Sequence, residues 1–351
     1  MSAFARGLQA RSATALTLLV FAAACSKDAS TITSAPAAES PAGEIPEDVS
    51  FAVLPITSIA NPIAGSGFWV DPYSNAAKTA AAWRVSSPAD AAQMDKLAQE
   101  GSARWIGNWN ANVQSDVDAA TTTMTAAGKL PVFVAYNIPQ RDCGGLSGGN
   151  STAPAAYRTW VTAFANGIGA RRAVVVLEPD ALAAMDCLSS ADRQTRLSLM
   201  KYAVQAFASK GNVTIYLDAG HPRWKSASTM AARLINAGVA QTQGFSLNVS
   251  NFHPTSDNVA YGTQISNLVG GKHFIVDTGR NGLGPTADFQ WCNPAGRALG
   301  DRPTTTTGVP LVDAFMWIKT PGESDGACNG NPSAGVWMPQ YALGLAQRAA
   351  Y

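Results

Sequence analysis

Acidic side chains that follow apolar runs are the residues of this sequence best suited to chemistry. Asp142 follows the apolar run 130–136, and Asp180 follows the run 173–177. Hydrolysis of a glycosidic bond needs a carboxylic acid that protonates the leaving oxygen and a second carboxylate that activates water or attacks the sugar. A neighbouring carboxylate raises the pKa of the acid by like-charge repulsion, so the acid keeps its proton near neutral pH. Asp142 and Asp180 end consecutive runs and are a natural pair for this purpose.

Polar residues also follow the later apolar runs. They are Asp218 and His221 after 213–217, Asn248 and Asn251 after 245–247, Asp277 and Arg280 after 273–276, and Lys319, Glu323 and Asp325 after 314–318. Turns are polar in most proteins, so one polar residue after a strand would mean little. Polar residues follow six successive runs here, which favours a shared functional site over ordinary turns. Enzymes built on parallel barrels collect their functional residues at the carboxyl ends of the strands. Arg141, Arg280 and Lys319 could bind an anionic substrate, and we favour their pairing with the surrounding acids.

Seven short apolar runs alternate with longer segments of helical pattern. The runs are 103–106, 130–136, 173–177, 213–217, 245–247, 273–276 and 314–318. The helical segments are 88–100, 113–128, 154–169, 190–211, 225–237 and 257–269. Continuous apolar strands separated by helices predict a parallel sheet that is covered on both faces. Seven runs in about 300 residues favour an α/β fold with a (β/α) barrel over an open sheet, and no glycine-rich nucleotide motif follows any run.

The composition favours a neutral substrate. Apolar residues make up 46% of the 351 residues, charged residues make up 14%, and the formal net charge is +1. This balance gives no reason to expect a nucleic acid or an anionic membrane surface as a partner. Nine Trp and eight Tyr could stack on sugar rings, although most such aromatic residues belong to protein cores.

The first 25 residues resemble a signal peptide that ends in a lipobox. The apolar stretch 13–24 follows two arginines, is too short to span a bilayer comfortably, and ends directly before Cys25. Lipid on Cys25 would anchor the protein to a membrane; ordinary cleavage nearby is the alternative, and both predict export. Residues 26–50 lack apolar periodicity and are predicted to be a disordered linker. The remaining residues, 51–351, are predicted to form one catalytic domain.

The cysteine count fits an exported protein. Apart from Cys25, four cysteines remain, an even set that suits an oxidising compartment: Cys143, Cys187, Cys292 and Cys328. Three pairings are possible, and the simplest is sequential. A bridge from Cys143 to Cys187 would tie together the loops of Asp142 and Asp180, and it would be worth about 4 kcal/mol in the chain-entropy model. A zinc site has little support, because there is no CxxC motif and the three histidines lack ligand spacing.

With these residues in place, positions 51–351 resemble glycoside hydrolase family 6, the inverting cellulases that include endoglucanases and cellobiohydrolases. The resemblance rests on several motifs in family order. They are Arg141-Asp142-Cys143, Val176-Leu177-Glu178-Pro179-Asp180, Tyr216-Leu217-Asp218-Ala219-Gly220-His221, 248–252, Asp277-Thr278-Gly279-Arg280-Asn281-Gly282, Trp291-Cys292-Asn293-Pro294 and 319–325. The implied fold is a distorted barrel with one strand missing or displaced, which agrees with seven runs. The implied disulfides are Cys143–Cys187 and Cys292–Cys328.

The resemblance also implies roles for single residues. Asp180 would be the general acid, and Asp142 would keep the pKa of Asp180 raised and help to activate water through a relay. Asp325 would be the base or a charged contact to the sugar. Tyr136 would press on the sugar that is distorted at the point of cleavage, and Ser147 would position the water that attacks it. The rings of Trp69, Trp224 and Trp291 would stack on sugars. The implied hydrogen-bonding groups are His221, Asn248, Lys319 and Glu323. Asp218 would support the site. No cofactor or metal is implied.

Short loops favour cleavage inside the polymer. The stretches from Asp180 to Cys187 and from Cys292 to Cys328 are short, whereas the family's cellobiohydrolases carry longer loops there that roof the site into a tunnel. We therefore predict a monomeric endoglucanase that acts on a β-1,4-glucan. The alternatives are an exo-acting cellobiohydrolase on the same fold and a surface lipoprotein that binds glucan without cleaving it. Gln140 and Asn137 stand where acids are common in the family, which could alter the charge around Asp142.

Overall fold

The computed structural model describes residues 60–146, 148 and 153–351. Four of the sequence predictions fall outside these residues: the signal peptide with Cys25, the linker 26–50, the start of the domain at residue 51, and the role of Ser147. The described residues all belong to one compact unit, Val49–Tyr351.

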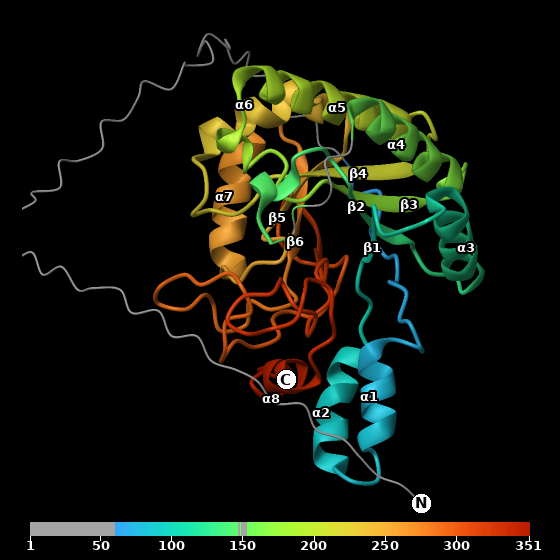
Figure 1. Cartoon of the computed structure of the whole chain (residues 1–351), viewed down its shortest axis with the longest axis vertical. Coiled ribbons are helices and arrows are strands. Elements are labelled where there is room, and N and C mark those ends of the chain that lie inside the picture. The colour runs from blue at the N-terminus through green and yellow to red at the C-terminus, as the bar shows by residue number, and fades with distance from the viewer. Residues whose placement is uncertain (1–59, 147, 149–152) are drawn as a thin grey trace, which may run out of the picture. The chain divides into compact units, whose positions relative to one another are not determined.

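Seven parallel strands form one sheet in the part of the chain that the structure describes, and they lie in sequence order (Figure 1). They are β1 (Arg104–Gly107), β2 (Val132–Tyr136), β3 (Ala173–Leu177), β4 (Val213–Asp218), β5 (Gly244–Leu247), β6 (His273–Asp277) and β7 (Val312–Met316). The residues just before β1 and just after β7 meet through one isolated bridge between Ser102 and Trp317. There the amide of Ala103 donates a hydrogen bond of 3.0 Å to the carbonyl oxygen of Trp317. The sheet is therefore a distorted (β/α) barrel, and the prediction of fold and strand number is confirmed.

Helices connect successive strands and cover the outside of the barrel (Figure 1). These are α3 (Val113–Ala126), α4 (Pro154–Ile168), α5 (Ser190–Ala208), α6 (Ala227–Ala237) and α7 (Thr255–Leu268), with short 3-10 turns η1 (Arg141–Gly144), η2 (Met185–Cys187) and η3 (Val239–Gln241). Asn112, Ser189 and Ser226 begin α3, α5 and α6 by accepting a backbone N–H bond with their side chains, which stabilises a helix start. Gly238 ends α6 with φ of 96°, a conformation that glycine adopts without a Cβ clash.

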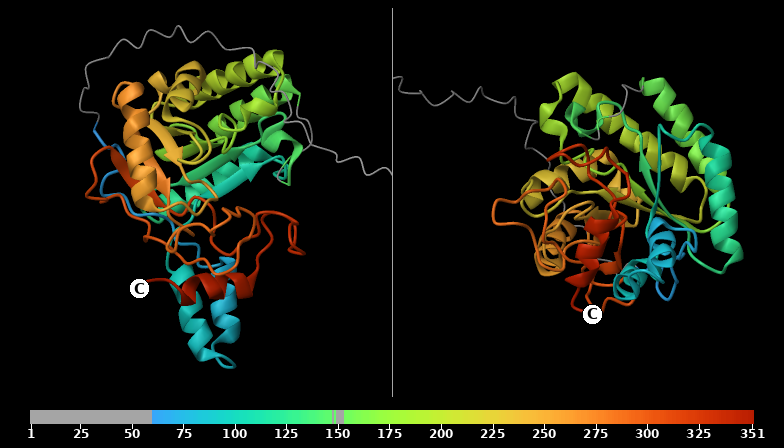
Figure 2. Two further views of the ribbon diagram at one scale, coloured as in Figure 1. Left: turned by 90° about the vertical axis from the view of Figure 1, so that its left-hand side faces the viewer. Right: turned by 60° about the horizontal axis from the view of Figure 1, so that its bottom comes forward.

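A second group of helices packs away from the barrel. It consists of α1 (Asn75–Trp83), α2 (Pro88–Ala98) and α8 (Pro339–Gln347), which bury Met94, Leu97 and Leu343 among themselves. Figure 2 shows this group across from the covering helices, with the irregular segments before and after β7 lying between it and the sheet. The sequence predicted α2 but not α1 or α8. No helix among residues 60–351 that the structure describes is both long and apolar enough to cross a membrane.

The strands are buried on both faces, which explains their continuous apolar runs. In β2, Val132, Val134 and Tyr136 belong to the cluster inside the barrel. Phe133 and Ala135 alternate with them and belong to the cluster under the helices. Because successive side chains of a strand point to opposite faces, both faces of these strands favour apolar residues, and few polar residues such as Asp313 lie within them. Polar residues gather instead at the carboxyl ends of the strands, where they share one rim of the barrel.

Candidate active site

A cavity of about 1140 Å³ opens at this rim. Its lining includes nine residues predicted from the sequence: Tyr136, Asp142, Asp180, His221, Trp224, Trp291, Lys319, Glu323 and Asp325. Residues that the sequence analysis did not assign to substrate also line it, among them Trp105, Trp109, Arg141, Arg223, His253 and Phe289. Side chains from widely separated loops thus meet in one cleft.

Asp180 is held at the end of β3 by its own backbone. Its N–H donates a hydrogen bond of 2.9 Å to Oδ2 of Asp218. The Asp218 carboxylate is fully buried and also accepts bonds from the N–H of Gly220 (3.1 Å) and the hydroxyl of Ser246 (3.2 Å). Burial and the negative charges of Asp218, Asp142 and Asp325 raise the pKa of Asp180 well above its ordinary value. The raised pKa favours the protonated form of Asp180, which is the form that a general acid needs.

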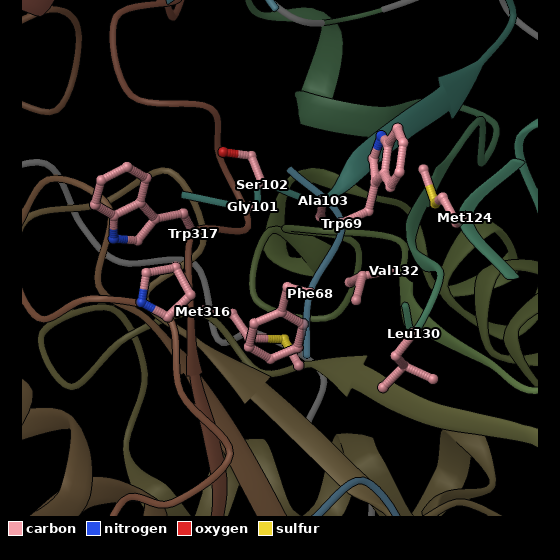
Figure 3. Close-up of a pocket in the computed structure, with 11 residues that line it drawn as sticks. Phe68, Trp69, Gly101, Ser102, Ala103, Met124, Leu130, Val132, Met316 and Trp317 are labelled. Carbon is pink, nitrogen blue, oxygen red and sulfur yellow. The ribbon is translucent and has the colours of Figure 1, made fainter. Parts of the chain in front are cut away.

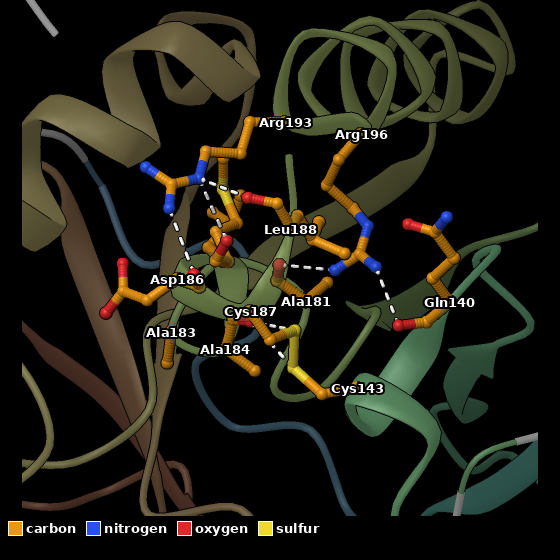
Figure 4. The surroundings of a disulfide bond; sticks show 12 residues. Gln140, Cys143, Ala181, Ala183, Ala184, Asp186, Cys187, Leu188, Arg193 and Arg196 are labelled. Carbon is orange, nitrogen blue, oxygen red and sulfur yellow. Dashed lines mark hydrogen bonds between the residues drawn. A yellow bond between two sulfur atoms is a disulfide. The ribbon is translucent and has the colours of Figure 1, made fainter. Parts of the chain in front are cut away.

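Asp142 reaches the cleft from the neighbouring strand end. It lies in η1, the next element after β2, with an unusual φ of 52°. The next residue, Cys143, forms a disulfide with Cys187, and Cys292 pairs with Cys328. Figure 4 shows the first disulfide joining the loop of Asp142 to the loop that follows Asp180. These are the pairs that the family resemblance implied, and two disulfides indicate an oxidising compartment.

Arginines from the covering helices fix the same two loops from behind (Figure 4). Arg196 of α5 is 3% exposed and donates to the carbonyl of Ala181 (2.7 Å) on the Asp180 loop. Its other terminal nitrogen donates to the carbonyls of Pro139 (2.7 Å) and Gln140 (3.0 Å) on the Asp142 loop. One guanidinium therefore spans both loops. Arg193 of α5, by contrast, donates only to carbonyls of the Asp180 loop.

Replacing Arg196 with lysine is expected to lower kcat by about tenfold or more, because small displacements of catalytic groups are costly. A lysine keeps the charge, but its ammonium cannot span both loops as the planar guanidinium does. Separation of Asp142 from Asp180 weakens their repulsion, so the alkaline limb of the pH–rate profile moves to lower pH. Arg193→Lys is the matched control. Equal profiles for both variants would show that Arg196 does not set the spacing of the two acids.

Asp325 is a fixed anion at the edge of the cleft. Its two oxygens accept bonds from the guanidinium of Arg280 at 2.8 and 2.9 Å, and Oδ2 also accepts the N–H of Asn293 at 2.9 Å. Both Arg280 and Asp325 are almost completely buried. A carboxylate held in this way has few lone pairs left to take a proton from water. Its clearer contribution is electrostatic, since its charge helps to raise the pKa of Asp180.

Glu178 is a buried carboxyl group under the cleft that the sequence analysis did not single out. It is fully buried, and Oε2 accepts hydrogen bonds from the N–H groups of Asn137 (2.9 Å) and Ile138 (3.0 Å). Burial raises the pKa of Glu178 to about 7, against the effect of these hydrogen bonds. Glu178 therefore ties the end of β3 to the chain leaving β2 without lining the cavity.

The free energy of unfolding is expected to fall as pH rises from about 4.5 to about 7. The pKa of Glu178 is about 7 in the fold and 4.5 ordinarily, so the native state binds the proton more tightly. Its contribution is complete below about 4.5 and is lost as pH passes through the folded pKa, a change of roughly 3 kcal/mol. Burial also raises the pKa of Asp218 and Asp277 to about 6, with the same sign. Urea unfolding at several pH values measures this, and Glu178→Gln should flatten the curve; an unchanged slope in that variant would contradict the assignment.

Two predicted substrate contacts, Trp69 and Asn248, do not line the cleft, and neither does the predicted supporting residue Asp218. Trp69 lines a separate small pocket beside Met124 and Leu130 (Figure 3), where its ring packs against the core. Asp218 is fully buried, so it supports Asp180 rather than touching substrate. Asn248 is also fully buried, and its amide donates to the carbonyls of Asp277 (2.8 Å) and His253 (3.2 Å). The structure therefore places Trp69 and Asn248 away from the cleft lining, where the resemblance implied contacts to sugar. It places Asp218 beneath Asp180, in agreement with the supporting role that the resemblance implied.

The rim of the barrel presents a carboxyl group with a raised pKa, further carboxylates and several aromatic rings, a combination typical of glycoside hydrolases. The sequence profile of the glycosyl hydrolases family 6 matches residues 63–349, and the chain belongs to that family.

Named relatives and a solved structure agree with this assignment. Endoglucanase A of Cellulomonas fimi is 44% identical over 291 residues, which are 82% of this chain and 62% of that protein. Endoglucanase 1 of Streptomyces halstedii is 41% identical over 307 residues, which are 84% of this chain and 93% of that protein. The endoglucanase Cel6 from Mycobacterium tuberculosis, solved in complex with methyl-cellobiosyl-4-deoxy-4-thio-β-D-cellobioside, is 46% identical with a TM-score of 0.78 and covers 82% of this chain and 99% of its own.

Proposed function

We propose that this enzyme hydrolyses internal β-1,4-glucosidic bonds of a glucan with inversion at the anomeric carbon. The observation that carries the proposal is the raised pKa of Asp180 at the wall of a long aromatic cleft. An acid that keeps its proton can protonate the leaving glycosidic oxygen. The family relatives named as endoglucanases support the choice of substrate.

In this mechanism Asp180 gives its proton to the leaving oxygen while water attacks from the opposite face of the sugar. Asp142 repels the charge that Asp180 would carry and so keeps that proton in place. The group that draws a proton from the attacking water is Asp325, which Arg280 and Asn293 hold in place, or Asp142 through a water relay. Tyr136 lines the same wall, with Trp105 edge-on to it at 5.2 Å.

Exposed aromatic side chains at the cleft rim favour internal cleavage. Trp109 is 55% exposed and Trp291 is 49% exposed although both line the cleft. Long loops over the cleft would cover these rings. An open cleft can instead bind a glucan chain at any point along the chain. The test compares the viscosity of a soluble cellulose with the release of reducing ends. A rapid loss of viscosity per bond cleaved supports endo action; a slow loss favours the exo-acting alternative.

We further propose that the chain is exported and that residues 1–25 are a leader ending at a lipidated Cys25. The two disulfides of the folded unit support export. The proposal includes a flexible linker at 26–50, a catalytic domain at 51–351, and a monomer that needs no cofactor. Mass analysis of the mature N-terminal peptide tests lipidation, since Cys25→Ser should abolish an acylated product. Tight binding to cellulose without new reducing ends would favour the non-catalytic alternative instead.

A further inference from the structure

One wall of the cleft carries an arginine that is stacked on an aromatic ring. The guanidinium carbon of Arg223 lies 4.0 Å from the centroid of the Phe289 ring, and both residues line the cleft. The Arg223 side chain is exposed, and no carboxylate within the described ranges lies within ion-pair distance of it. The ring supports the guanidinium on one side by a cation–π contact, and the exposed side chain leaves N–H groups available to a ligand.

The groups beside Arg223 on this wall do not compete for an anion. His221 and His253 stack on each other with ring centroids 4.3 Å apart. Burial lowers the pKa of both, that of His221 to about 3, and the positive charge of Arg223 lowers both further. Both rings are therefore neutral at physiological pH. Asp257 acts on His253 from α7, but it does not line the cleft.

The other cations of the cleft already have partners. The Lys319 ammonium donates to the carbonyl of Ser324 at 3.1 Å and lies 3.8 Å from Glu323. Arg141 donates to the carbonyl of Tyr136 at 2.7 Å and to the amide oxygen of Asn108 at 3.1 Å. The cleft is thus uneven in charge: carboxylates surround Asp180, whereas the wall of His221 and Trp224 presents the guanidinium of Arg223.

We propose that Arg223, which lies over the Phe289 ring, forms a subsite for a carboxylate carried by the glucan, so that the enzyme prefers acidic β-1,4-glucans, such as those substituted with uronic acid or carboxymethyl groups, over uncharged ones. A planar guanidinium can bind a carboxylate through two parallel hydrogen bonds. Because the Phe289 ring already restricts the arginine side chain, less conformational entropy is lost when the carboxylate binds. Trp224 lies next to Arg223 and offers a ring for the sugar that bears the charge. This inference rests on the proposed glucanase activity.

The test measures kcat/KM on carboxymethylcellulose and on uncharged hydroxyethylcellulose, and takes the ratio of the two. Arg223→Gln is expected to lower this ratio by about three- to fivefold, the range of one solvent-exposed charge pair. The matched control is Arg158→Gln. Arg158 also stacks on a ring, 4.7 Å from the centre of Tyr202, but it lies outside the cleft, so its ratio should equal that of the wild type.

Added salt should reduce the wild-type preference and leave the Arg223→Gln ratio nearly unchanged. A second variant, Phe289→Leu, keeps an apolar side chain but removes the stacked ring, and it should lower the ratio in the same direction. The inference would be overturned if Arg223→Gln and Phe289→Leu both had the same ratio of kcat/KM on the two polymers as the control Arg158→Gln. Failure of the underlying function is distinguishable, because wild-type enzyme would then release no reducing ends from either polymer.

Discussion

Asp180→Asn is expected to lower kcat on cellohexaose by about a thousandfold or more, within the upper range of general acid catalysis. Asparagine preserves the shape of the side chain and the bond from the residue 180 amide to Asp218, but it cannot donate a carboxylic acid proton. A substrate with a dinitrophenyl leaving group needs no proton, so its hydrolysis should fall far less. This contrast between substrates identifies the proton donor.

The matched control for this prediction is Asp186→Asn. Asp186 belongs to the same loop, and its carboxylate pairs with Lys225 and Arg233 outside the cleft. The control should lower both activities little and to the same extent. If Asp180→Asn slowed the activated and the natural substrate equally, Asp180 would not be the acid. In the wild type, activity should also fall as pH rises through the raised pKa of Asp180, and the Asn variant should lack this limb.

Arg280→Met is expected to lower the free energy of unfolding by about 3–5 kcal/mol, because it leaves the buried Asp325 carboxylate without its counter-charge. The Arg280 side chain is 1% exposed and that of Asp325 is 4% exposed. Arg280 also donates to the carbonyl of Ser250 at 2.5 Å and lies over the ring of Phe252. Its loss therefore affects the loops after β5 and β6 together. Urea denaturation at a fixed pH measures the change.

Two further variants give this prediction its controls. The double variant Arg280→Met with Asp325→Leu removes both charges and should recover much of the lost stability. Arg302→Met removes an exposed arginine that lies 3.6 Å from Glu100 and should cost less than about 1 kcal/mol. Equal effects of Arg280→Met and Arg302→Met would contradict the account of Asp325 as a buried, charge-balanced anion.

The strands and their order could be predicted because burial on both faces leaves a clear mark on the sequence. Runs such as 173–177 coincide with a strand, β3 (Ala173–Leu177). The run 314–318 is displaced from β7 (Val312–Met316), because Asp313 is buried inside the strand and interrupts the apolar pattern. There the Asp313 carboxylate accepts hydrogen bonds from Tyr216 (2.7 Å) and Gln243 (2.9 Å), which explains how a strand residue can be charged.

The acidic residues of the site could be predicted from the sequence, but the residues that hold them in position could not. Asp142 and Asp180 were found because they follow strands, and the cleft contains both. Arg196 could not be found in this way, because it binds backbone carbonyls, which every residue possesses. Trp105 and Trp109 were missed because no charged residue marks the end of β1. The side chains of Asp218 and Asn248 point into the protein because their local backbone, and not their place after a strand, decides their direction.

The central claim is that water displaces the leaving sugar directly while Asp180 supplies a proton. Proton NMR of cellohexaose during the first moments of hydrolysis tests it most directly, because the signals report the anomer formed at each new reducing end and the bond that was cut. Direct displacement by water should produce the α-anomer first, from cleavage at internal bonds, and this anomer should then equilibrate. Initial formation of the β-anomer would contradict it.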